Sequence, residues 1–171
     1  LLVEELDAEH RGRTLVFVRT KRGADRLVKK LKAQDVHAVA MHGDKSQSQR
    51  ERALARFEKG KVDTLVATDV AARGIDVDGI SHVINYDPPA DRDGYVHRIG
   101  RTARAGRSGV GVTFVGTEHA RDVERIASEL RLEREFAETA LSSPAGGGRP
   151  GPRHERPRSR ERSRGRGRGR R

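Results

Sequence analysis

The sequence predicts an α/β fold, in which a doubly wound, mainly parallel β-sheet carries helices on its faces. Five short apolar runs, which are typical of buried strands, lie between residues 14 and 115. Segments with apolar residues at helical spacing alternate with these runs, as they do in βαβ units. Polar and glycine-containing segments follow several of the runs. In parallel sheets, ligands gather beyond the carboxyl ends of the strands.

The first part of this pattern follows a charged lead-in, residues 1–13, which we expect to be a helix or the end of an interdomain linker. Residues 14–18 (TLVFV) predict the first strand and residues 36–41 (VHAVAM) the second. Between them, an i, i+3, i+4, i+7 spacing predicts a helix from about Thr20. The apolar face of this helix consists of Ala24, Leu27, Val28 and Leu31.

The segment HGDKSQSQRERALARFEKG follows the second strand and predicts another helix. Ser48 and Glu51 have the spacing of a capping box, and Gly60 is a typical helix end. The buried side of this helix is expected to consist of Ala53, Leu54 and Phe57.

The second half of the domain continues the alternation. Three more strands are expected at residues 65–67 with their neighbours, at 82–86 (HVINY) and at 110–115. Pro88 and Pro89 break the chain before an arginine-rich helix, for which Asp91 is the expected cap. A last helix from Thr117 is expected to bury Val123, Ile126, Ala127 and Leu130.

The positive charge of the chain is unevenly distributed. The formal net charge is +11, but residues 142–171 hold eleven Arg and two Glu, which leaves +2 for the first 141 residues. Residues 142–171 have no Phe, Tyr or Trp and hardly any aliphatic side chain, so burial cannot offset the entropy of ordering them. We therefore expect a folded domain at residues 14–141 and a disordered, basic tail at 142–171.

Several classes of protein are disfavoured by composition. The chain has no cysteine, which excludes disulfides, thiolate metal sites and cysteine nucleophiles and fits a cytoplasmic location. Its histidines show no metal-ligand spacing, and no apolar run reaches the ~18 residues of a membrane span. Because the chain begins at Leu1 rather than at Met, we expect it to be a piece of a longer protein.

Residues 95–107 (YVHRIGRTARAGR) form the most unusual stretch of the chain, with four arginines in ten residues. If this stretch is helical, with about 100° per residue, His97, Arg101 and Arg104 form one stripe, flanked by Arg98 and Arg107. Like charges at this spacing repel one another unless an anion lies against them. The stretch is therefore either an anion site or a solvated basic helix face.

The pattern H-R-I-G-R-T-x-R resembles the last motif of superfamily-2 helicases, and its His97 points to the DEAD-box RNA helicase branch. The resemblance implies that Arg101 and Arg104 are catalytic arginine fingers for an ATP held on another domain. It also implies that His97 and Arg98 lie on the ATP-binding, interdomain side. Ala103 stands where many members have Gly, and since alanine favours helix we expect this difference to have no effect.

The segment TLVATDVAARGIDV, residues 64–77, resembles the helicase motif T-D-x-x-A-R-G-x-D. A strand followed by a glycine turn is the alternative interpretation. The resemblance implies that Thr68 and Gly74 contact the RNA backbone. It implies that Asp76 is a polar contact near the ATP ribose and the arginines, and that Arg73 links the two sites.

The segment MHGDKSQSQRERALARF is described equally well as an amphipathic surface helix, but it also resembles the Q-x-x-R pattern of the same family. The resemblance implies that Gln47 and Arg50 contact RNA phosphates and that Gly43 offers a backbone amide. An arginine in the first turn of a helix is a physically reasonable phosphate site. TLVFVRTK and VINYDPP resemble two further, mainly structural motifs.

Together these motifs occupy residues 15–107 in the order and spacing of the second RecA-like domain of DEAD-box helicases, with weaker similarity to about Leu130. The chain has neither a P-loop, G-x-x-x-x-G-K-[ST], nor a D-E-A-D motif. ATP with Mg²⁺ would therefore be bound mainly by an N-terminal RecA-like domain outside this chain, and the chain alone should be inactive.

The resemblance implies an ATP-dependent RNA helicase whose partners are RNA and its own N-terminal domain. No membrane partner is expected. Two alternatives remain: a stand-alone RNA-binding or chaperone module, and the motor domain of a DNA-directed superfamily-2 helicase. The basic tail has no aromatic residue for base stacking, so it should bind RNA by charge alone, or else serve in solubility or self-association.

Overall fold

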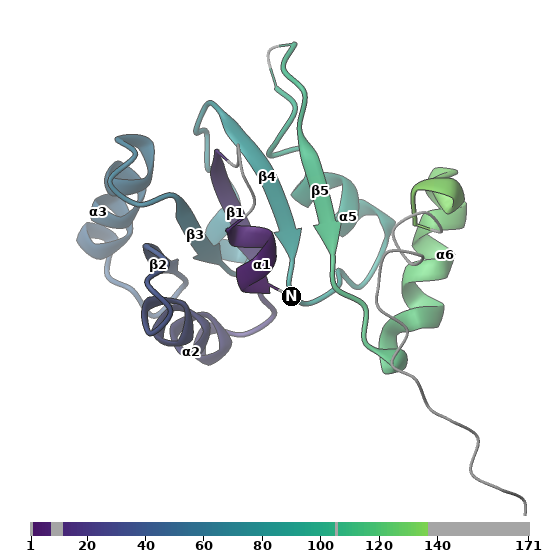
Figure 1. Cartoon of the computed structure of the whole chain (residues 1–171), viewed down its shortest axis with the longest axis horizontal. Helices are drawn as coiled ribbons and strands as arrows, with labels where there is room; N and C mark the ends of the chain where they lie inside the picture. Colours follow the sequence, from purple (N-terminus) through teal and green to yellow (C-terminus); the bar gives the residue numbers. More distant parts are fainter. Residues whose placement is uncertain (1, 8–11, 105, 137–171) are drawn as a thin grey trace, which may run out of the picture.

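The computed structural model describes residues 2–7, 12–104 and 106–136, and these form one parallel five-stranded sheet flanked by helices (Figure 1). The strand order is β2-β3-β1-β4-β5, and every neighbouring pair is parallel. The α/β, RecA-like sheet that the sequence predicts is therefore confirmed. The strands are β1 (Arg13–Phe17), β2 (Ala38–Met41), β3 (Thr64–Ala67), β4 (Ile80–Asn85) and β5 (Val110–Thr113).

Helices alternate with the strands, and each crossover returns the chain to the same end of the sheet (Figure 1). The α-helices are α1 (Leu2–Leu6), α2 (Lys21–Lys32), α3 (Gln47–Glu58), α4 (Asp69–Ala72), α5 (Arg92–Ile99) and α6 (Ala120–Leu130). A short 3₁₀ helix, η1 (Thr117–His119), precedes α6. No helix in the described part of the chain is both long and apolar enough to cross a membrane.

The sheet buries both of its faces, because successive strand residues point to opposite sides. In β1, Leu15 and Phe17 join a core covered by α3 and α4. Val16 and the following Val18 join a second core, covered by α1 and α2. The predicted apolar face of α2 is fully buried there. Leu2 and Leu6 of α1 are also buried, so this part of the lead-in packs on the sheet.

The predicted start of α3 is wrong by two residues. Ser46, not Ser48, is the N-cap: its hydroxyl accepts from the backbone N–H of Gln49 at 3.3 Å, and the Gln49 side chain accepts from the Ser46 N–H at 2.9 Å. Each serine is followed three positions later by a residue that can complete a capping box, Gln49 after Ser46 and Glu51 after Ser48. The choice follows from tertiary contacts, since Asp44 and Lys45 are ion-paired to α2 and fix where the chain turns.

The arginine-rich helix is shorter than the sequence predicts. Asp91 caps α5 as expected, accepting from the Gly94 N–H at 2.7 Å, but the helix ends at Ile99. Arg101 and Arg104 lie in the turns that follow, so the single helical stripe with His97 is wrong. The chain leaves the helix because the Thr102 hydroxyl donates to the carbonyl of Ile80 at 2.6 Å and is buried.

The last helix also differs in detail from the prediction. It begins at Ala120 rather than Thr117, because η1 takes the first turn. Its expected apolar side is buried except for Leu130, which is half-buried. α6 lies beside α5 (Figure 1), and the ring of Phe136 contacts that of Tyr95, with centroids 6.1 Å apart.

Candidate functional site

The carboxyl ends of β2, β3 and β4 bring part of the site to one end of the sheet. Gly43 follows β2, Thr68 follows β3, and Asp87 follows β4. α5 begins at the same end and runs back toward the amino ends of the strands (Figure 1). The arginines of residues 98–107 therefore extend along the sheet face from one end to the other.

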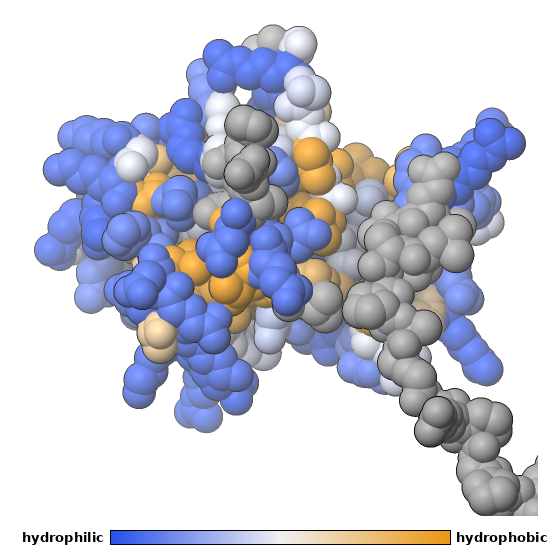
Figure 2. All heavy atoms as spheres, in the orientation of Figure 1, coloured by the Kyte–Doolittle hydropathy of each residue, from blue (hydrophilic) through white to orange (hydrophobic). Residues whose placement is uncertain are grey.

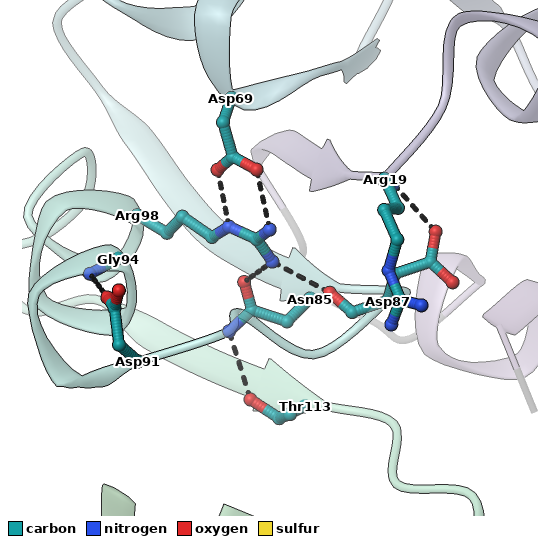
Figure 3. A network of polar contacts seen from close by, with 8 residues as sticks. All are labelled: Arg19, Asp69, Asn85, Asp87, Asp91, Gly94, Arg98 and Thr113. Carbon is teal, nitrogen blue, oxygen red and sulfur yellow. Dashed lines mark hydrogen bonds and ion pairs between the residues drawn. The ribbon is translucent and has the colours of Figure 1, made fainter. Parts of the chain in front are cut away.

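Arg98 is the centre of this arrangement (Figure 3). Its Nε and Nη2 donate to the two carboxylate oxygens of Asp69 at 2.6 and 2.8 Å. Its Nη1 donates to Asn85 Oδ1 at 3.1 Å and to the Asp87 carbonyl at 2.7 Å. The guanidinium also lies over the Phe17 ring, 5.0 Å from the centroid. Arg98 thus joins α5 to the ends of three strands.

Only 4% of Arg98 is exposed, and four of its five N–H groups are occupied by these contacts. The resemblance implied a place on the nucleotide side, and Arg98 lines the same hollow as His97 and Arg101 although nearly all of its side chain is enclosed. Asn85 extends the network by donating to Thr113 Oγ1 at 3.0 Å. The sequence motifs did not indicate the roles of Asp69 and Asn85. The signal that could have found them was a polar residue at the end of an apolar strand, as for Asn85, or shortly after one, as for Asp69.

Arg101 and Arg104 are less enclosed than Arg98 and have fewer partners. Arg101 is half-buried and donates from Nη1 to the Ile75 carbonyl at 2.9 Å. Arg104 donates from Nη1 to Asp76 Oδ1 at 2.9 Å and from Nε to the Gly100 carbonyl at 2.9 Å. The Asp76 side chain is 90% exposed. Such surface ion pairs contribute at most about 1 kcal/mol, so an incoming anion can replace the carboxylate.

Two hollows flank Arg101 along the sheet face. The larger has a volume of about 560 Å³ and brings together Arg73, His97 and Arg101, with Asp69 and Asp91 in its wall. The smaller has a volume of about 160 Å³ and is lined by Arg101, Arg104 and Arg107 around Gly79 and Ser81. The residues to which the resemblance gives nucleotide-side roles therefore line two hollows that share Arg101, except Asp76, which contacts Arg104.

Ala103 does not continue a helix. Its φ is +55°, in the left-handed region that non-glycine residues adopt at a cost of about 1–2 kcal/mol. The expectation that alanine favours helix at this position is therefore wrong. A left-handed residue turns the chain toward β5, so glycine suits this position better.

The predicted RNA-contacting residues lie at the ends of β2 and β3. Thr68, which is nearly buried, is the N-cap of α4, and its side chain makes no capping hydrogen bond. Gly74 has a φ of +79°, and a Cβ added there would have no neighbour within 4 Å. The backbone around Gly74 is consequently open to a ligand, and its conformation favours glycine.

The same end of the sheet carries the start of α3. Gln47 is exposed and donates from Nε2 to Glu51 Oε1 at 2.9 Å, while Gly43 is exposed beside the Lys21 side chain. Arg50 is half-buried, and its Nε has no hydrogen-bond partner among the described residues. The three residues are thus in one region, and Arg50 has a donor available.

The connection from β2 to α3, residues 42–46, is held against α2 by charge pairs. Lys21 donates to Asp44 Oδ1 at 2.6 Å, and Lys45 contacts Asp25 Oδ1 at 2.9 Å. Buried His42 lies with Nε2 3.1 Å from Asp25 Oδ2. The hydrogen bond from Lys45 lowers the pKa of Asp25, and the one from Lys21 lowers the pKa of Asp44. These contacts fix the segment that precedes Gln47 and Arg50.

Within the residues that the structure describes, no three His, Asp or Glu side chains are grouped so that they could hold a metal ion.

Comparison with known proteins shows the family to which the chain is similar. Residues 1–106 match the family described as helicase conserved C-terminal domain. The Escherichia coli DEAD-box protein SrmB, solved bound to regulator of ribonuclease activity A, is similar over 75% of each chain, with 39% identity and a TM-score of 0.72.

Two longer proteins are similar over part of their length. A DEAD-box protein from the hyperthermophile Methanococcus jannaschii has 39% identity and a TM-score of 0.70 over 77% of this chain and 36% of its own. Saccharomyces cerevisiae Dbp5, solved bound to RNA and ADP BeF3, has 33% identity and a TM-score of 0.67 over 77% of this chain and 38% of its own. This chain thus spans little more than a third of these two proteins. The chain belongs to the helicase C-terminal domain family and corresponds to the C-terminal domain of a DEAD-box RNA helicase.

Proposed function

We propose that this domain is one half of an ATP-driven RNA helicase and supplies Arg101 and Arg104 to the phosphates of an ATP bound by the N-terminal domain. The observation that carries the proposal is the weak attachment of both side chains. Arg101 has a carbonyl partner and Arg104 has an exposed carboxylate, and both face hollows lined by further arginines. A polyphosphate is a stronger partner for a guanidinium than either of them.

The two arginines act electrostatically. ATP with Mg²⁺ supplies the phosphoryl group and part of the charge neutralisation, and the guanidinium groups stabilise the charge that develops as the terminal phosphoryl is transferred. Arginine fingers elsewhere raise the rate by roughly 10³–10⁵. Asp76 holds Arg104 in place until the domains close and is then free to face the ribose. Arg73 and His97 line the hollow next to Arg101, on the side toward the RNA residues.

The other half of the proposal concerns RNA. Gly43 follows β2, Thr68 follows β3 and Gly74 follows α4, while the first turn of α3 contains Gln47 and Arg50. These residues would form part of a groove for the RNA backbone. The groove would be completed when the two helicase domains close, so that one strand of a short duplex is bent and released. The RNA-bound and ADP BeF3-bound state of Dbp5 supports this assignment by similarity.

The test is Arg104→Ala in the full-length protein. ATP turnover should fall by at least about 10³-fold in a steady-state ATPase assay, because the charge of the transferred phosphoryl loses a guanidinium. Folding should be nearly unaffected, because the lost ion pair is exposed.

Arg125→Ala is the matched control, since Arg125 is an exposed arginine of α6 whose partner, Asp122, lies one helical turn away. It should leave turnover unchanged. Near-normal turnover in the Arg104 variant, with the control also normal, would refute the role of Arg104.

A further inference from the structure

We infer that a second pocket, on the α2 side of the sheet, binds a nucleotide unit of the RNA beyond the groove proposed above. This α2 pocket has a volume of about 300 Å³ and lies at the carboxyl ends of β1 and β4. Its distinctive lining residues are Arg19, Arg26, Lys30, Tyr86 and Asp87. The inference rests on the proposed RNA-binding function, but these residues have no place in that groove.

The charge of the α2 pocket is positive and largely uncompensated. Arg26 and Lys30 lie one turn apart on α2 and point into it, and neither forms an ion pair within the described part of the chain. The one acidic residue of α2, Asp25, is engaged by Lys45 and His42. The pocket therefore presents cations that are available for an anion.

The remaining lining residues are fixed by the fold. The carboxylate of Asp87 accepts the backbone N–H of Arg19 at 2.7 Å, which orients it toward the end of β1 (Figure 3). The Arg19 guanidinium lies 3.1 Å from His119 Nε2. One carboxylate thus faces three basic side chains, and the net charge of the pocket stays positive.

The exposed ring of Tyr86 favours a nucleotide over other anions as the ligand of the α2 pocket. Tyr86 is 39% exposed, and its ring meets Phe114 edge-on, with centroids 6.3 Å apart, so Phe114 supports the ring in position. The chain contains only two tyrosines, and this one opens into a basic pocket. Exposed aromatic rings beside basic side chains are how proteins bind single-stranded nucleic acid, the ring stacking on a base and the cations contacting phosphates. An acidic peptide would use the cations and leave the ring without a partner.

The order of the strands places this pocket at the same end of the sheet as the groove. Thr68 follows β3, Arg19 follows β1 and Tyr86 follows β4, and these three strands are neighbours. Adjacent strands are about 5 Å apart, so the pocket begins some 5 to 10 Å farther along the same end of the sheet. The pocket lies on the α2 side of this end and the α3 residues of the groove lie on the other side, so an RNA strand that leaves the groove would cross the end of the sheet to reach it. Figure 2 shows hydrophilic side chains covering α2 on this face.

The first experiment reverses the charge of the pocket. The double variant Arg26→Glu/Lys30→Glu in the 171-residue chain should bind fluorescent twelve-nucleotide oligouridine about tenfold or more weakly. The steepness of the log affinity against log salt plot should fall by about 1.4, since each lost phosphate contact removes roughly 0.7.

Arg56→Glu/Lys59→Glu is the matched control, with the same charge change on exposed residues at the other end of α3. It should alter the affinity by less than about threefold. An equal loss in both double variants would mean a general field effect and would overturn the inference.

The second experiment tests the ring. Tyr86→Leu should weaken oligouridine binding by about fivefold or more, whereas Tyr86→Phe, which keeps the stacking face, should preserve it. Thermal unfolding of both variants checks that the contact with Phe114 is not the cause. A Tyr86→Leu variant with normal affinity would overturn the inference.

A third comparison separates the inference from the function on which it rests. Gln47→Ala/Arg50→Ala should weaken RNA binding through the groove alone. If only this variant loses affinity, the proposed function stands and the pocket is not an RNA site. If neither this variant nor the pocket variant loses affinity, both proposals fail. Polyglutamate that competes equally well, independently of Tyr86, would identify an acidic peptide as the ligand and overturn the inference.

Discussion

At the scale of single residues, the arginines of the segment 98–104 have opposite surroundings although their sequence context is similar. Arg98 is buried, bidentate to Asp69 and stacked over Phe17, whereas Arg104 pairs with an exposed carboxylate. A buried charge that loses its partner costs far more than an exposed one. The first arginine therefore holds α5 to the ends of the strands, and the last one has an exposed partner that an anion can replace.

The difference predicts the stability of two variants. Arg98→Ala leaves the Oδ1 of buried Asn85 without its donor and should lower the free energy of unfolding by about 1–3 kcal/mol. Arg104→Ala should lower it by less than about 1 kcal/mol. Urea unfolding of both variants, followed by circular dichroism, measures the two values. Equal, small losses would contradict the structural role of Arg98.

At the scale of elements, the segment between β2 and α3 depends on its attachment to α2. Asp25 accepts contacts from Lys45 and buried His42, while Asp44 pairs with Lys21. The pKa of Asp25 is lowered, chiefly by the hydrogen bond from Lys45. Its charged form therefore stabilises the folded state. That contribution is complete above the unfolded pKa of about 3.9 and is lost as the pH falls through the lower, folded pKa.

Asp25→Asn should accordingly destabilise the domain at pH 7, by about 1 kcal/mol for a partly exposed pair. The difference in Tm between the variant and the original chain should shrink below about pH 4, where Asp25 of the original chain also becomes protonated. Thermal unfolding between pH 3 and pH 7 measures this convergence. A Tm difference that stays constant over the whole range would show that the carboxylate charge is not the cause.

At the scale of the whole molecule, most of the net charge lies in residues 142–171, outside the described residues. The folded part is close to neutral, and its basic sites are local: the arginine surface beside α5 and the α2 pocket. We therefore expect residues 142–171 to supply most of the affinity for RNA, and the local basic sites of the domain to determine where the RNA lies.

Deletion of residues 142–171 tests this division. If about nine charges of this segment neutralise phosphates, they contribute about −6 to the salt slope on single-stranded RNA, at roughly −0.7 for each contact. The deletion should remove most of that slope and leave the Tm of the domain unchanged. RNA affinity measured across a salt series provides the check, and an unchanged slope would rule out RNA binding by this segment.

Much of the fold followed from local pattern. The five strands, the buried face of α2 and the cap of α5 were each encoded by neighbouring residues: apolar runs, a helical period, and Asp91 before the helix. The family also followed from local motifs, because they were intact and in order. The sequence could not decide whether Ser46 or Ser48 is the N-cap of α3, because both have the spacing of a capping box. Contacts of the preceding residues with α2 select Ser46.

The sequence by itself determined the parallel sheet and the family, because periodicity and motif order are properties of short stretches. Only the tertiary structure decided which arginine is buried and which pairs with an exposed carboxylate. That choice depends on Asp69 and Asn85, which are 29 and 13 residues away from Arg98 along the chain. No local pattern encodes such a contact, since it exists only when β3 and β4 lie on either side of β1.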